Sequence, residues 1–62
     1  MKPAPFYHVE YVLKLGDRWT PHVLPIRDPS EAEAERKRRD GDKLYACVRV
    51  TGPHEHMVPD NG

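Results

Sequence analysis

The chain has 62 residues, so it can form one small domain with a thin core, because a chain this short buries only about 60% of its unfolded surface. Ten basic and ten acidic side chains cancel, which excludes the overall positive field typical of nucleic-acid binders and tolerates association. The single cysteine, Cys47, excludes an internal disulfide, and with no long apolar run or signal-peptide pattern the sequence indicates a cytoplasmic protein.

The first part of the chain predicts a β-hairpin. Residues 1–5 contain two prolines and indicate a flexible, extended lead-in. Over residues 6–15 apolar side chains occupy the odd positions, which predicts a half-buried strand. Gly16 and Asp17 predict the turn, and a second strand is expected over 18–26.

The hairpin allows two registers, which place opposite faces of the second strand against the core. A two-residue loop places Tyr11 opposite His22, as the turn residues favour. A three-residue loop places Tyr11 opposite Val23, as apolar matching favours. We expect the second register, with Trp19 and Val23 on the inner face.

Pro21 and Pro25 decide the place of the second strand. They are an even number of residues apart, so their missing N–H groups lie on the same side of the strand. A central strand needs donors on both sides, and the second strand is therefore expected at an edge of the sheet.

A helix is expected next, with Asp28 as N-cap, Pro29 at its first position, Glu31 completing a capping box and Gly41 ending it. Its only apolar side chains after Pro29 are two alanines, at positions 32 and 34. Two arrangements follow. Either the helix packs tightly on the sheet with charged stems at its margins, or part of the apolar sheet surface stays open for an interaction.

A third strand is expected over 43–51, followed by a tail, so that the ordered core covers about residues 6–52 and residues 53–62 form a flexible extension. Because the second strand is an edge, the third must pair with the other side of the first. The sequence thus predicts an α+β fold, ββαβ, with a three-stranded antiparallel sheet in order 2-1-3 and one helix on one face.

Candidate chemical groups are few. His54-x-His56, with His8, His22 and Cys47 elsewhere, is the only conceivable metal set, and we expect no metal site because one needs three or four ligands in fixed geometry. Cys47 would need a histidine such as His8 beside it to act as a nucleophile, and a lone strand cysteine is more often a packed hydrophobe. No enzyme activity and no cofactor are therefore expected.

The third strand contains no proline and in the 2-1-3 order leaves one row of backbone groups unpaired, so it can accept a strand from another protein. The residues expected to bind a partner are Tyr45, Cys47, Arg49, Arg36, Arg38 and Arg39. Two alternatives stay open. The basic run 36–39 and an outer face bearing aromatic and histidine side chains could bind nucleic acid, or the open edge could pair with a second copy of the chain.

The order of elements over residues 6–51, namely a hairpin, a helix with an acidic start and a last strand, resembles the small phage-encoded inhibitor of bacterial RNA polymerase from short-tailed coliphages. The resemblance lies in pattern and carries over no signature residue, and the basic helix end 36–39 departs from it. It implies an inhibitor that docks on a larger host protein, host RNA polymerase or another host enzyme.

Overall fold

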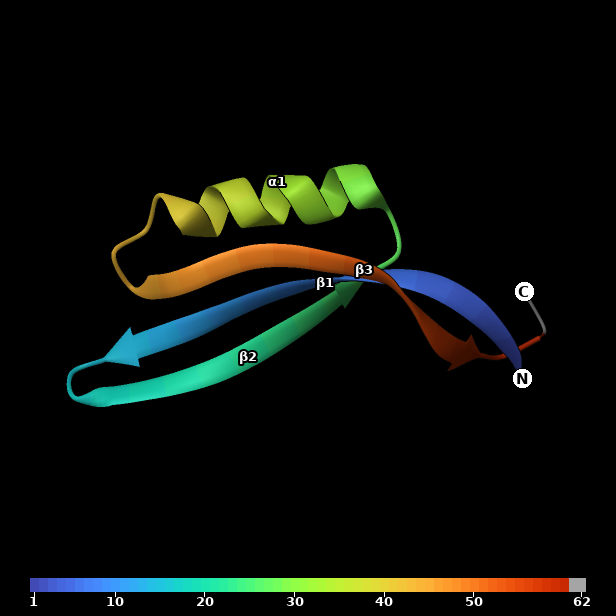
Figure 1. Cartoon of the computed structure of the whole chain (residues 1–62), viewed down its shortest axis with the longest axis horizontal. Helices are drawn as coiled ribbons and strands as arrows, with labels where there is room; N and C mark the ends of the chain where they lie inside the picture. The colour runs from blue at the N-terminus through green and yellow to red at the C-terminus, as the bar shows by residue number, and fades with distance from the viewer. Residues whose placement is uncertain (61–62) are drawn as a thin grey trace.

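The computed structural model describes residues 1–60, which form three strands and one helix. The elements in chain order are β1 (Lys2–Leu15), β2 (Arg18–Ile26), α1 (Pro29–Asp40) and β3 (Tyr45–Val58). The strands make one antiparallel sheet in the order β2-β1-β3, and α1 lies along β3 (Figure 1). The predicted α+β class, strand order and single helix are confirmed.

The two prolines of β2 occupy an edge strand, as predicted. Pro21 pairs with Val12 and Pro25 pairs with His8. Since proline has no N–H group, these are the non-hydrogen-bonded pairs of the ladder, and both prolines turn their nitrogens away from β1. The outer side of β2 therefore lacks two of its donors.

The register predicted for the hairpin is wrong. Gly16 has a φ of +61°, which suits a two-residue turn, and Tyr11 consequently pairs with His22. Trp19 and Val23 lie on the sheet face opposite α1, with 63% and 55% of their surface exposed. The turn geometry outweighed apolar matching because the even-numbered residues of β2, which face α1, also include apolar side chains. Those half-buried residues are Leu24 and Ile26.

The strands also extend beyond the expected ordered core, at both ends of the chain. Residues 2–6 pair with residues 54–58, so most of the two segments expected to be flexible, 1–5 and 53–62, form a two-stranded ribbon, while residues 61 and 62 lie outside the described part of the chain. The prolines at positions 3 and 5 do not prevent this, because β2 ends at Ile26, opposite Tyr7, and no β2 residue pairs with this part of β1. Their missing donors can therefore face outward while the ladder to β3 stays intact.

Two irregularities interrupt β3. The register against β1 shifts by one residue near Cys47 and again near Gly52, as expected of β-bulges. Both residues have positive φ, +53° and +126°. At Gly52 a Cβ atom would lie 3.0 Å from the carbonyl oxygen of Phe6, so this bulge requires glycine.

α1 begins and packs in a way that suits its small side chains. Asp28 caps it by accepting a hydrogen bond from the amide of Ser30 at 3.0 Å, whereas the sequence predicted a capping box with Glu31. Ala32 is fully buried, and Arg39 extends its guanidinium over the ring of Tyr11 at 4.8 Å. α1 thus packs close to the sheet, with a charged stem as part of the contact.

The molecule is elongated and its core is thin. The fully or almost fully buried apolar residues are Val9, Ala32 and Ala4. The radius of gyration is 13.4 Å, compared with about 10.6 Å expected for a compact domain of this length. Within residues 1–60 there is no helix long and apolar enough to cross a membrane.

Candidate protein-binding surface

The backbone of β1 divides its hydrogen bonds between its two neighbours. Because Pro21 and Pro25 pair with even-numbered residues of β1, those even residues cannot bond to β2 at the proline positions and must turn toward β3. One hydrogen bond beyond the ladder agrees, since the amide of Lys14 donates to the carbonyl oxygen of Leu44 at 2.8 Å. The even-numbered residues of β1 therefore carry the ladder to β3.

This parity identifies the groups that β3 leaves open. Arg49 and Thr51 pair with even residues of β1, so their backbone groups point inward. The alternate residues, Val48 and Val50, point their N–H and C=O groups to the other side, where no strand pairs with β3 among residues 1–60. We call these backbone groups of Val48 and Val50 the free flank of β3.

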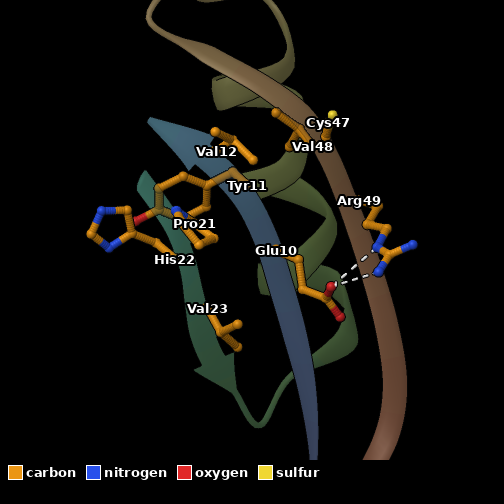
Figure 2. A pocket seen from close by; sticks show the side chains of 9 residues that line it. All are labelled: Glu10, Tyr11, Val12, Pro21, His22, Val23, Cys47, Val48 and Arg49. Carbon is orange, nitrogen blue, oxygen red and sulfur yellow. Dashed lines mark hydrogen bonds and ion pairs between the residues drawn. The ribbon is translucent and has the colours of Figure 1, made fainter. Parts of the chain in front are cut away.

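The sheet face opposite α1, here called the outer face, contains a shallow hollow of about 460 Å³ next to this flank (Figure 2). Val12, Pro21 and Val23 supply apolar side chains on this face, and an ion pair closes one end. The residues lining the hollow are Glu10, Tyr11, Val12, Pro21, His22, Val23, Cys47, Val48 and Arg49.

The charged end of the hollow is a hydrogen-bonded pair that links β1 to β3. Arg49 donates to Glu10 Oε1 from Nη2 at 2.8 Å and from Nε at 3.1 Å, as Figure 2 shows. Thr51 donates its hydroxyl proton to Glu10 Oε2 at 2.7 Å. These hydrogen bonds, that from Thr51 foremost, hold the pKa of Glu10 below its usual value. Arg49 remains 69% exposed and can meet a further anion.

The structure separates the six residues that the sequence predicted to bind a partner. Cys47 and Arg49 lie on β3 beside the hollow, and both are exposed. Tyr45 instead contacts the ring of Tyr11 edge-on at 5.1 Å and lies under Arg39 at 5.7 Å, on the face that α1 covers. Tyr45 is therefore part of the packing between helix and sheet.

The three predicted arginines of α1 each pair with a carboxylate. Arg36 forms an ion pair with Glu33 at 2.6 Å, and Glu35 forms ion pairs with both Arg38 and Arg39. The guanidinium of Arg39 is held by Glu35 and lies over the ring of Tyr11, and the hydrogen bond to Glu35 is the main cause that raises the pKa of Arg39. The arginines expected as a cationic patch are thus largely engaged within the helix.

Sequence reasoning overlooked the hollow and the individual open groups. The spacing of Pro21 and Pro25 could have identified the open backbone groups of Val48 and Val50. It determines which residues of β1 turn their backbone groups toward β3, and thus which residues of β3 turn theirs away. The hollow had no comparable signal. It depends on the register of β2 and on the bulge at Cys47, neither of which the pattern of residues determines.

The histidines fall into two places. His22 stacks on Tyr11, with ring centroids 5.5 Å apart. His8, His54 and His56 come together where the two chain ends pair. In the part of the chain that the structure describes, no group of three or more His, Cys, Asp or Glu residues is arranged to hold a metal ion.

The fold and its surface define a small α+β module with one strand edge blunted by proline and one edge open. No protein-family model matches the chain, and the searches of curated proteins and of solved structures found no match. The function must therefore be inferred from the geometry of the chain itself.

Proposed function

We propose that this chain is a small, non-enzymatic protein-binding module that adds an extended segment of a larger protein to the free flank of β3. The observation that carries the proposal is the asymmetry of the two sheet edges. Pro21 and Pro25 remove donors from the outer side of β2, whereas Val48 and Val50 present complete donor and acceptor groups. Strand addition of this kind draws affinity from the backbone and selectivity from alternate side chains.

The bulges of β3 limit the length of the added segment. Between the register shifts at Cys47 and Gly52 the regular part of β3 is Val48–Thr51, which offers few backbone bonds. Affinity must then depend on side chains that reach the outer face. An acidic side chain of the partner would meet Arg49, and an apolar one would enter the hollow beside Val12.

The resemblance in element order to the phage inhibitor of bacterial RNA polymerase supports an inhibitory role and gives a first partner to test. We also propose a cytoplasmic site of action, on the grounds given by the sequence, namely a single cysteine and no signal-peptide pattern. Purified bacterial RNA polymerase is the appropriate probe, and its transcription in the presence of the chain is the measurement.

The edge is tested by removing one donor without changing a side chain. In a synthetic chain, N-methylation of Val50 removes an N–H of the free flank and places a methyl group where a partner strand would lie. Peptides selected from a random displayed library on the unmodified chain should bind this variant at least about tenfold more weakly.

N-methylation of Trp19 is the matched control, because it alters an outward-facing position on the blunted edge strand β2 and Trp19 does not line the hollow. Its peptide affinities should stay within about twofold of the unmodified chain. Equal binding by the Val50 variant, provided that it still folds, would rule out strand addition at β3.

A second copy of the chain is the competing occupant of the same edge. Two β3 strands can pair antiparallel about a twofold axis, and a net charge of zero does not oppose this. Sedimentation over a concentration series distinguishes the two occupants. A dimer that N-methyl-Val50 dissociates would assign the edge to self-association.

A further inference from the structure

Three imidazoles meet at the base of the ribbon that joins the two chain ends. The Nε2 atoms of His8 in β1 and His56 in β3 are 2.7 Å apart. The ring of His54 stacks on that of His8, with centroids 4.0 Å apart and an interplanar angle of 19°. We call these three residues the histidine cluster. They link strand segments far apart in sequence. His54 and His56 belong to the ribbon in which residues 2–6 pair with 54–58, and His8 lies just beyond it.

The contacts of the histidine cluster depend on how many protons it holds. The Nε2 atoms of His8 and His56 form a hydrogen bond only while one carries a proton and the other does not. One added proton can be shared, but two would leave N–H groups facing each other. His54 donates from Nε2 to the hydroxyl oxygen of Thr51 at 3.0 Å while Thr51 donates to Glu10, and protonation of the other ring nitrogen of His54 leaves this hydrogen bond in place.

The surroundings of His8 give little compensation for added positive charge. The groups that face it are Glu10 on β1, His54 and His56 on β3, and the uncharged Pro25 opposite it on β2. Burial first, and then the two other imidazoles, lower the pKa of His8, while Glu10 acts in the opposite direction. Glu10 is already engaged by two donors, so it neutralises only part of the charge.

We propose that the histidine cluster is a pH-sensitive clasp, which holds the two chain ends together at neutral pH and releases them in mildly acidic solution. Opening separates the imidazoles and exposes residues 2–6 and 54–58, while the sheet of β2, β1 and the first half of β3 stays folded. The device does not depend on the partner proposed above, because it acts on a different part of β3.

The sign of the effect follows from proton uptake. A histidine with a lowered pKa in the closed form binds more protons once the ribbon opens, so closure is favoured above the ordinary histidine value of 6.5 and weakens as pH falls below it. Each proton excluded from the closed form makes the open population rise about tenfold per pH unit. Glu10, whose pKa is lowered from 4.5, keeps its charge throughout this range.

Amide hydrogen exchange followed by NMR tests the clasp at single residues. Ala4 lies in the ribbon, opposite His56, and Val12 lies in the same β1–β3 ladder beyond it, opposite Ala46. Between about pH 7.5 and about pH 5.5, in buffer with a metal chelator, protection of Ala4 should fall about tenfold or more after correction for intrinsic rates. Protection of Val12 should stay within about threefold.

Substitutions identify the groups that titrate. His8→Phe keeps an aromatic ring without a titrating nitrogen, so it should abolish the pH response of Ala4. His56→Gln removes the hydrogen-bond partner and leaves His8 stacked on His54, so it should weaken that response. His22→Gln, outside the histidine cluster, should leave that response intact. If His8→Phe does not fold, His56→Gln decides alone. The clasp is refuted if Ala4 shows no pH response, if Ala4 and Val12 lose protection together, or if the folded variants respond like the parent chain.

Discussion

At the scale of single residues, backbone conformation explains more of this structure than apolar content does. Cys47 adopts a φ of +53°, which costs an L-residue about 1–2 kcal/mol because its Cβ crowds the backbone. Gly52 adopts +126° at the second bulge, where no Cβ is present. The two bulges thus differ in strain, and only the one beside the hollow carries it.

The strain at Cys47 can be measured by comparing two substitutions. Cys47→Gly should raise the free energy of unfolding by about 0.5–1 kcal/mol, because relief of the positive φ exceeds the entropy cost of glycine. Cys47→Ala removes the same sulfur and keeps the strain, so it should leave stability unchanged within about 0.5 kcal/mol. Urea unfolding of both variants gives the comparison. A glycine variant no more stable than the alanine variant would show that the bulge is unstrained.

At the scale of elements, one long cationic side chain does much of the covering that apolar residues of α1 would normally do. Ala32 permits close approach, but it can cover only a small area of the sheet. Arg39 lies over Tyr11 at 4.8 Å and Tyr45 at 5.7 Å, and Glu35 holds its guanidinium in place. A helix almost without apolar side chains can therefore still pack on an apolar sheet.

This role of Arg39 predicts a large difference between neighbouring arginines. Arg39→Ala should destabilise the fold by about 1–2 kcal/mol, since it removes a half-buried stem and two cation–π contacts. Arg38→Ala removes an arginine that shares Glu35 but is 75% exposed, so its effect should be under about 0.5 kcal/mol. Thermal and urea unfolding provide the values, and equal effects at the two positions would contradict this assignment.

The elements also show what the sequence could predict. The prolines of β2 predicted its edge position, because a strand that lacks donors on one side cannot pair on both sides. The edge position in turn predicted the strand order. The hairpin register was mispredicted since both faces of β2 carry apolar residues, of which Trp19 and Leu24 are examples. The ribbon at the chain ends was missed because its pairing is long-range and follows a bulge at Gly52.

The positions of the candidate site residues were predicted less completely than the fold. β3 and its side chains Cys47 and Arg49 lie where the pattern suggested, beside an open edge. Tyr45 and Arg39 proved to pack against each other, because the bulge at Cys47 changes which residues of β3 face α1. Periodicity alone assigns faces only while a strand is regular.

At the scale of the whole molecule, an elongated single sheet with a helix on one face leaves considerable surface open. The accessible surface of 4633 Å² exceeds the roughly 4100 Å² typical of a folded protein of this mass. Exposed apolar side chains such as Trp19 and Val23 lie on the outer face. This open surface supports the proposal that a partner binds at the free flank of β3.

The alternation of backbone groups along β3 is the most direct test, and it needs no partner. Hydrogen exchange of the isolated chain at low concentration should show Arg49 and Thr51 protected, while the amides of Val48 and Val50 exchange at least about tenfold faster, near the rate of an unstructured chain. Equal protection of all four amides, or protection of Val48 and Val50 instead, would mean that the flank is already paired and would contradict the account.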